Sequence, residues 1–205
     1  MQTTKLSYLH AMGIQPWQLK TQSQPSCDSL TASDWDELRA SVKNITTSRS
    51  VFGVGNQNAD LMIIGDAPTL DDEKQGEPLV GRPGQLLTAM LNSIGLDRPS
   101  VYITTLFKCR EPVSEKIESW LNLLEKQIAL IQPKLLLVLG QNTAHYLLNN
   151  TLTLDQLRGK IHLLNNTPLV VTYHPAHLLS TPLDKSNALC DLQLTYKTLQ
   201  TLNKI

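Results

Sequence analysis

The stretch from Leu61 to Gly84 constrains the fold most. Four apolar residues, Leu61 to Ile64, are too few for a helix and are closed by Gly65, so they predict a short strand buried on both faces. Prolines and glycines interrupt residues 66–84, which predicts a long polar loop. Because loops at the carboxyl ends of parallel strands hold the ligand sites of α/β proteins, this loop is the first candidate for a functional site.

The loop also carries consecutive carboxylates, at Asp71, Asp72 and Glu73. Such a run is more typical of a solvated acidic tip than of a metal site, so we expect these side chains to be exposed. His145 and His177 have no partner at the spacing of metal ligands, and we assign them no role.

Three further apolar runs predict strands that alternate with helices. The strands are expected at Val101–Phe107, Leu135–Leu139 and Leu169–Thr172. Apolar residues at helical spacing predict helices from Ser33 past Val42, over Gln85–Leu96, from a cap at Ser114 to Ile131, over Ala144–Leu148 and from Lys185 to about Leu202. This alternation favours an α/β fold, a three-layer sandwich around a mostly parallel four-stranded sheet.

Composition limits the classes of function. Eighteen basic and eighteen acidic residues cancel, so we expect weak or no direct DNA binding. Cys27, Cys109 and Cys190 are odd in number and far apart, which favours a reducing cytoplasm over a disulfide framework. No apolar run reaches the roughly 18 residues of a membrane span, and no signal-peptide core opens the chain. We therefore expect a cytoplasmic protein without a membrane partner.

The amino-terminal part has its own organisation. Residues 1–22 carry apolar and aromatic side chains, and residues 23–33 form a linker of small and polar residues. The predicted division is a segment at 1–22, a linker at 23–33 and a folded domain at 34–205. The spacing leaves open whether the segment folds back on its own domain or binds another protein.

Three motifs together resemble a known family. GDAPTLDDEKQGEPLVGRPGQLL, VYITTLFKCREP and VVTYHPAHLL are similar, in this order and at similar spacing, to the signature regions of the iron-sulfur type of bacterial uracil-DNA glycosylase. The similarity extends over roughly residues 38 to 195. It implies the uracil-DNA glycosylase fold.

The resemblance also implies four site positions. Enzymes of this family flip a uracil nucleotide into a pocket and cut its glycosidic bond. The family pattern has a Glu for water or the sugar cation, a Phe that stacks on the base, an Asn that reads uracil, and a His that donates to the base. This chain has Asp66, Leu79, Thr105 and His174 at these positions.

Three of the four positions depart from the family pattern. Asp66 is a methylene shorter than Glu, and a displacement of about 1 Å can cost around 100-fold in rate. Leu79 has no stacking face, and Thr105 lacks the paired donor and acceptor of an amide. We therefore expect a vestigial pocket at Asp66, Leu79, Thr105 and His174, with no catalytic residue.

The resemblance further implies a four-iron cluster held by four cysteines. The corresponding positions are Ala40, Lys43, Cys109 and Trp120. A single thiolate cannot hold such a cluster, so we expect neither metal nor cofactor here. The hypothesis is that Trp120 and its neighbours fill the volume with apolar packing.

The amino-terminal segment carries the pattern Leu9-x-x-Met12-Gly13-Ile14-x-x-Trp17-x-Leu19. This pattern resembles the start of the psi subunit of the bacterial DNA polymerase III clamp-loader complex. The resemblance rests on a pattern of about a dozen residues. It implies that residues 5–20 bind the clamp-loader ATPase (gamma/tau), and that the domain holds a chi-like partner and, indirectly, single-stranded DNA-binding protein. The binding residues would be Tyr8, Leu9, Met12, Gly13, Ile14, Trp17 and Leu19.

The sequence therefore favours a non-catalytic, psi-like adaptor of the clamp loader. The alternative is a divergent uracil-DNA glycosylase that acts in base excision repair through Asp66 and His174. A third reading is a glycosylase-fold module that binds some other partner.

Overall fold

The computed structural model describes residues 32–46, 49–112 and 116–204, without the side chains of Ala32 and Ser33. Ala32–Ile205 forms one compact unit. Residues 1–31 lie outside the described part, so the predicted segment and linker stay predictions. Among the described residues, no helix is long and apolar enough to cross a membrane.

The sheet has six strands rather than the four expected. Its order is β1-β3-β2-β4-β6-β5. The four predicted strands are the parallel centre, and an antiparallel strand lies at each edge. The strands are β1 (Val54–Gly55), β2 (Leu61–Gly65), β3 (Tyr102–Thr105), β4 (Leu135–Leu139), β5 (Ile161–Leu164) and β6 (Thr167–Thr172).

The two edge strands were missed for different reasons. β1 is only two residues long, too short for an alternating pattern. β5 is joined to β6 by the pair Asn165-Asn166, whose φ angles are 46° and 71°. Two consecutive positive φ values make the tight turn that suits a hairpin, and Asn tolerates them better than most residues. The Asn pair was therefore the available hairpin signal.

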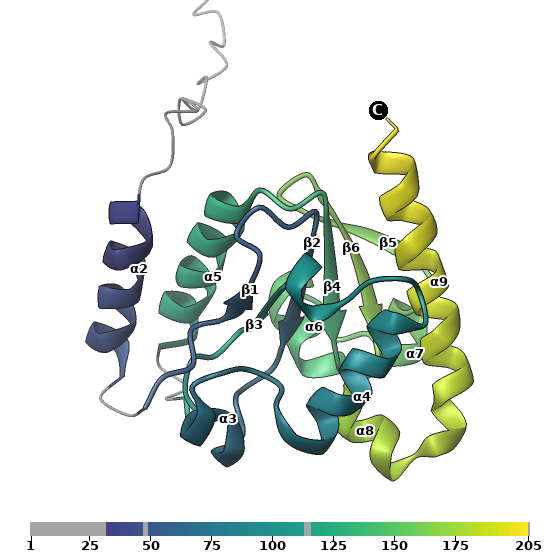
Figure 1. Cartoon of the computed structure of the whole chain (residues 1–205), viewed down its shortest axis with the longest axis horizontal. Helices are drawn as coiled ribbons and strands as arrows, with labels where there is room; N and C mark the ends of the chain where they lie inside the picture. Colours follow the sequence, from purple (N-terminus) through teal and green to yellow (C-terminus); the bar gives the residue numbers. More distant parts are fainter. Residues whose placement is uncertain (1–31, 47–48, 113–115, 205) are drawn as a thin grey trace, which may run out of the picture. The chain divides into compact units, whose positions relative to one another are not determined.

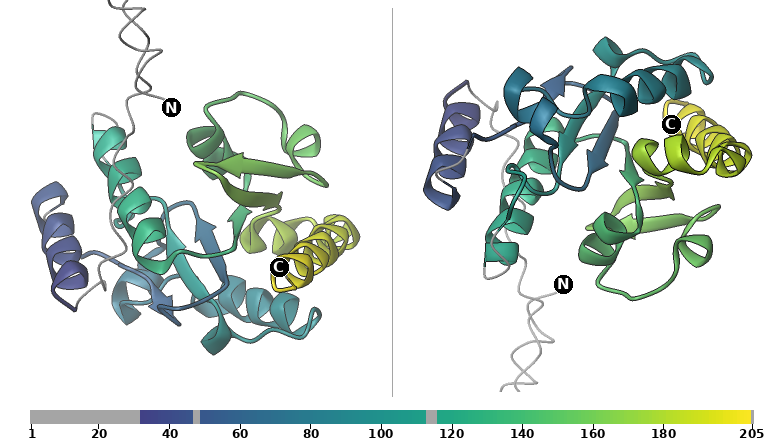
Figure 2. Two further views of the ribbon diagram at one scale, coloured as in Figure 1. Left: turned by 90° about the horizontal axis from the view of Figure 1, so that it is seen from above. Right: turned by 90° about the horizontal axis from the view of Figure 1, so that it is seen from below.

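Helices cover both faces of the sheet (Figure 1). The helices are α2 (Ala32–Ile45), α3 (Leu70–Gln75), α4 (Gly81–Asn92), α5 (Ile117–Ile131), α6 (Gln141–Leu148), α7 (Leu154–Leu157), α8 (Pro175–Ser180) and α9 (Lys185–Leu202). One core packs α2 and α5 against alternate strand residues such as Met62 and Ile64. The other packs α4 and α9 against Leu61 and Ile63. The views from above and below show the same three layers (Figure 2). The predicted α/β sandwich is confirmed.

Leu189, Leu192, Tyr196 and Leu199 stand at helical spacing in α9 and predict its buried face, but this prediction is only partly right. Leu192 and Leu199 are buried as expected, whereas Leu189 and Tyr196 are exposed by 40% and 39%. Asp191 is fully buried on the face that packs against the sheet. A polar residue at a core position is accepted when it has a buried partner, and Asp191 has one, as described below.

The stretch between β2 and α4 is not an irregular loop throughout. It contains α3, which starts after Thr69 and ends at Gly76 in the left-handed conformation. Thr69 and Asp72 form a capping box, each bonding to the other's backbone. The prediction of a fully exposed acidic tip is wrong for Asp72, because this side chain is buried.

Candidate active site

A cleft of about 530 Å³ opens where β2, β4 and β6 end. Asp66 follows β2, Gly140 follows β4, and His174 comes two residues after β6. All three residues line the cleft. The structure therefore brings together Asp66 and His174, the two residues through which the alternative reading expected a glycosylase to act. Ligand sites at this edge of a parallel sheet are the general rule for open α/β folds.

Asp66 is half-buried and lines the cleft. Its backbone carbonyl accepts the Phe107 N–H at 3.0 Å, so the turn after β2 is tied to the chain that leaves β3. Its Oδ2 accepts a hydrogen bond from Asn142 Nδ2 at 3.4 Å. This contact holds one carboxylate oxygen toward α6.

His174 is the N-cap of α8, and its Nδ1 accepts the Ala176 N–H at 3.2 Å. Nδ1 therefore carries no proton in this arrangement, and the proton of a neutral ring is on Nε2. Burial lowers the pKa of His174 from its ordinary value of 6.5, and the nearby Asp66 carboxylate opposes this shift. The ring is thus a neutral hydrogen-bond donor at neutral pH.

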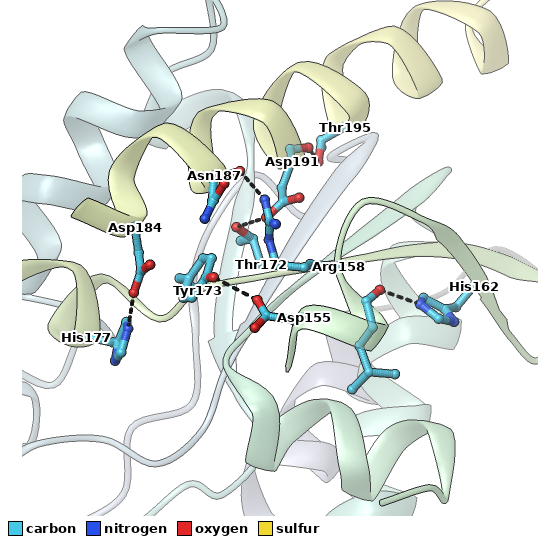
Figure 3. A network of polar contacts seen from close by, with 11 residues as sticks. Asp155, Arg158, His162, Thr172, Tyr173, His177, Asp184, Asn187, Asp191 and Thr195 are labelled. Atoms are coloured by element: carbon cyan, nitrogen blue, oxygen red, sulfur yellow. Dashed lines mark hydrogen bonds and ion pairs between the residues drawn. The ribbon is translucent and has the colours of Figure 1, made fainter. Parts of the chain in front are cut away.

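Two polar pairs also line the cleft (Figure 3). The Tyr173 hydroxyl donates to Asp155 Oδ1 at 3.1 Å, and His177 Nε2 lies 2.7 Å from Asp184 Oδ2. The rings of Tyr173 and His177 stack with centroids 5.4 Å apart. His177, to which we assigned no role, therefore helps to shape the cleft. Its spacing of three residues from His174 was the available signal.

Next to these pairs, the buried Asp191 joins α9 both to Arg158 at the end of α7 and to Thr172 of β6 (Figure 3). Arg158 Nε lies 3.1 Å from Asp191 Oδ2, which also accepts the Thr172 hydroxyl at 3.0 Å. Burial raises the pKa of Asp191, and Thr172 and Arg158 oppose this shift. The Arg158 guanidinium also lies over the Tyr173 ring, 5.3 Å from its centroid. The cleft wall is thus held by a network that includes the end of β6.

Leu79 and Thr105 do not line the cleft. Both are buried, at 5% and 1% exposure, against the turn at Gly65. Thr105 Oγ1 has no hydrogen-bond partner among the described residues. The stacking and base-reading positions of the family pattern are thus part of the core here.

The segment that carries Leu79 is strongly held. Leu79 has a φ of 54°, a left-handed conformation that is unusual for a residue with a branched side chain. Arg98 donates to the carbonyls of Leu79 and Pro78 at 3.3 and 3.2 Å, and the Val80 N–H donates to Asp72 Oδ1 at 2.7 Å. The burial of Asp72 could not be predicted from the sequence, because Asp72 stands in a run of carboxylates that is typical of a solvated surface.

A buried lysine lies beside the end of β3. Lys108 Nζ donates to Thr104 Oγ1, the Thr105 carbonyl and Gln127 Oε1, at 2.6, 2.5 and 2.6 Å. Burial lowers the pKa of Lys108 well below its ordinary value, whereas three acceptors for three N–H groups favour the ammonium form. Lys108 does not line the cleft, so we assign it a structural role that joins β3 to α5.

The chain matches a known protein family. A family model described as the Uracil DNA glycosylase superfamily matches residues 52–193. This range covers more than half of the chain. The chain belongs to the uracil-DNA glycosylase superfamily. The match includes Asp66, His174 and all the strands of the sheet.

Curated relatives are named type-4 uracil-DNA glycosylases. The protein of Archaeoglobus fulgidus is 36% identical over 150 residues, which cover 67% of this chain and 75% of the relative. That of Sulfurisphaera tokodaii is 34% identical, with 66% and 68% covered. That of Saccharolobus solfataricus is 36% identical, with 65% and 68% covered.

These relatives overturn the leading functional prediction. The expectation of a non-catalytic, psi-like clamp-loader adaptor is wrong, because the superfamily match spans most of the folded domain and the relatives are named as glycosylases. The psi resemblance rested on residues 5–20, which lie outside both the described residues and the matched range. The binding of these residues to a clamp-loader ATPase, and of the domain to a chi-like partner, is untested.

The residues at the cluster positions do not fit an iron-sulfur cluster. Ala40 and Lys43 are exposed on α2, whereas Cys109 and Trp120 are buried in the core shared by α2 and α5. Within the described residues, no group of three or more His, Cys, Asp or Glu could hold a metal ion. Only Cys109 offers a thiolate at these positions, and one thiolate cannot hold a four-iron cluster.

Proposed function

We propose that the chain is a DNA glycosylase that removes uracil from DNA and so starts base excision repair. The observation that carries the proposal is the convergence of Asp66 and His174 on one cleft at the carboxyl edge of the parallel strands. The proposal is supported by relatives that are named as uracil-DNA glycosylases and match most of the folded domain.

In the proposed reaction the bond between N1 of uracil and C1′ of deoxyribose breaks. The electron pair of this bond leaves with the base, the oxygen of a water molecule bonds to C1′, and the proton that this water loses ends on N1 of the anionic base. Positive charge develops on the sugar and negative charge on the base, so the site must stabilise both. Because the target base is stacked in DNA, the nucleotide must first turn out into the cleft.

Asp66 and His174 suit these two charges. The Asp66 carboxylate stabilises the sugar cation and orients the water that attacks it. The Nε2–H of His174 donates to a carbonyl oxygen of the departing base, because its Nδ1 is already occupied by the Ala176 N–H. A neutral donor can stabilise the charge on the base without giving up its own proton.

Base release from a labelled single-stranded oligonucleotide with one uracil tests this proposal. The protein should be made in a host without uracil glycosylase, and the abasic product should be cleaved by alkali. We expect release by the wild-type chain, and a loss of at least about 100-fold in Asp66→Asn and His174→Asn. Asp71→Asn is the matched control, because Asp71 is exposed on α3, outside the cleft.

No release with the protein in excess over the oligonucleotide would overturn the proposal. Release that persists undiminished in both cleft variants would overturn the assignment of Asp66 and His174.

A further inference from the structure

The cleft contains an amide that the family resemblance did not point to. Asn142 lies in the first turn of α6 and lines the cleft together with Asp66 and His174. Its side chain is exposed, whereas Thr105, the position of the base-reading amide in the family pattern, is buried outside the cleft. Of these two residues, Asn142 is therefore the one that can contact a base in this cleft.

The start of α6 holds Asn142 at a fixed place. Gly140 has a φ of 95°, and its N–H donates to the Thr172 carbonyl at 2.8 Å, which ties the turn after β4 to β6. A Cβ added at Gly140 would lie 3.5 Å from the Cβ of His174, so this turn lies close against the histidine. The neighbouring amide, Gln141, accepts the Leu154 N–H at 3.0 Å and is thereby engaged.

The hydrogen bond to Asp66 sets the orientation of the Asn142 amide. Nδ2 donates to Asp66 Oδ2, and the opposite orientation would place Oδ1 against a carboxylate oxygen. Among the described residues this is the hydrogen bond that the Asn142 side chain makes, so Oδ1 and the second N–H are available to a ligand. The cleft thus presents one acceptor and one donor in a defined order.

The acceptor and the donor of Asn142 are complementary to the groups on uracil but not to those on cytosine. Uracil offers an N3–H donor beside an O4 acceptor, whereas cytosine offers an N3 acceptor beside an N4 amino donor. We propose that Asn142 selects the base, accepting N3–H with Oδ1 and donating to O4 with its free N–H. The inference rests on the proposed function and names the residue that determines its specificity.

Binding of uncleavable substrates tests this role. Oligonucleotides with one 2′-fluoro-deoxyuridine or one 2′-fluoro-deoxycytidine are compared by fluorescence anisotropy, and the ratio of their dissociation constants is the readout. We expect the wild-type chain to prefer the uridine by about tenfold or more, and Asn142→Ala and Asn142→Asp to bring the ratio close to one. Thr105→Val and Asn92→Ala should keep the wild-type ratio, since neither residue lines the cleft.

The outcomes separate the two proposals. A wild-type ratio near one, or a preference that survives in both Asn142 variants, overturns the role of Asn142. A loss of preference in Thr105→Val also overturns it, because the base would then reach Thr105. Selective binding through Asn142 in a chain that releases no uracil would sink the proposed reaction alone. Thermal melting of each variant checks that the exposed Asn142 is not needed for folding.

Discussion

Val80 donates its backbone N–H to the buried carboxylate of Asp72 across 2.7 Å, and this bond fixes the segment that carries Leu79. Asp72 also accepts the Thr69 N–H and hydroxyl, at 2.7 and 2.8 Å. We predict that Asp72→Ala destabilises the protein by about 3 kcal/mol, since it leaves the half-buried Val80 N–H without its partner and removes a helix cap.

Urea unfolding measures this effect, and Asp71→Ala is its control. Asp71 is exposed and makes one surface ion pair with Lys74 at 3.8 Å, so its loss should change the free energy of unfolding by less than about 0.5 kcal/mol. Equal losses in the two variants would show that Asp72 is an ordinary surface carboxylate.

The hydroxyls of Thr104 and Thr105 should differ in their effect on stability. Thr105 Oγ1 has no partner among the described residues, so Thr105→Val removes an unsatisfied polar atom and should be neutral or stabilising by about 1 kcal/mol. Thr104 Oγ1 donates to the Phe52 carbonyl at 2.9 Å and accepts from Lys108 Nζ. Thr104→Val should therefore cost about 2 kcal/mol. Calorimetric melting of the pair decides, and the reverse order of stabilities would refute this account of the β3 end.

Stability should depend on the titration of His174. Burial lowers its pKa in the folded state below the 6.5 of the unfolded chain. Between the two values the unfolded state binds more protons, so stability falls as the pH drops below about 6.5 and stops falling below the folded pKa. His174→Asn keeps a side-chain acceptor at the N-cap and should lose this part of the pH dependence.

Urea titrations of both proteins between pH 7.5 and 5 measure the difference. The same pH slope in both would mean that His174 is not desolvated.

The cluster positions give a further prediction. The purified chain should contain no stoichiometric iron, because Cys109 is the only thiolate among the four positions. Trp120 is buried at 1% exposure, so Trp120→Ala should cost about 3–5 kcal/mol through the cavity it leaves. Trp120→Phe should cost less, since it also deletes an indole N–H that has no partner within the described residues. Metal analysis that finds several iron atoms per chain would contradict the apolar packing.

The parallel centre of the sheet could be predicted because burial on both faces leaves a continuous apolar run, as at Leu135–Leu139. The helix α9 could be predicted from the helical spacing of its apolar residues, but the face that it buries could be predicted only in part. Asp191 lies in the core because Arg158, more than thirty residues earlier, pairs with it, and a periodic pattern cannot show such a partner.

The candidate site divides in the same way. Asp66 and His174 were predicted from the family resemblance, and each also follows a strand that the sequence marks clearly. Asn142 lies three residues after β4, but the family pattern points instead to Thr105, which the fold buries. Asp72 differs from its neighbouring carboxylates because it accepts the N–H of Val80, eight residues away, and the sequence does not show this contact.

Direct detection of free uracil by mass spectrometry tests the central claim most simply. The wild-type chain is incubated with a uracil-containing single strand, and free base and abasic sites are counted in the same sample. The account predicts that both appear in equal amounts, and that the double variant Asp66→Asn, His174→Asn produces neither. Intact oligonucleotide after incubation with excess wild-type protein, or equal release by the double variant, would contradict it.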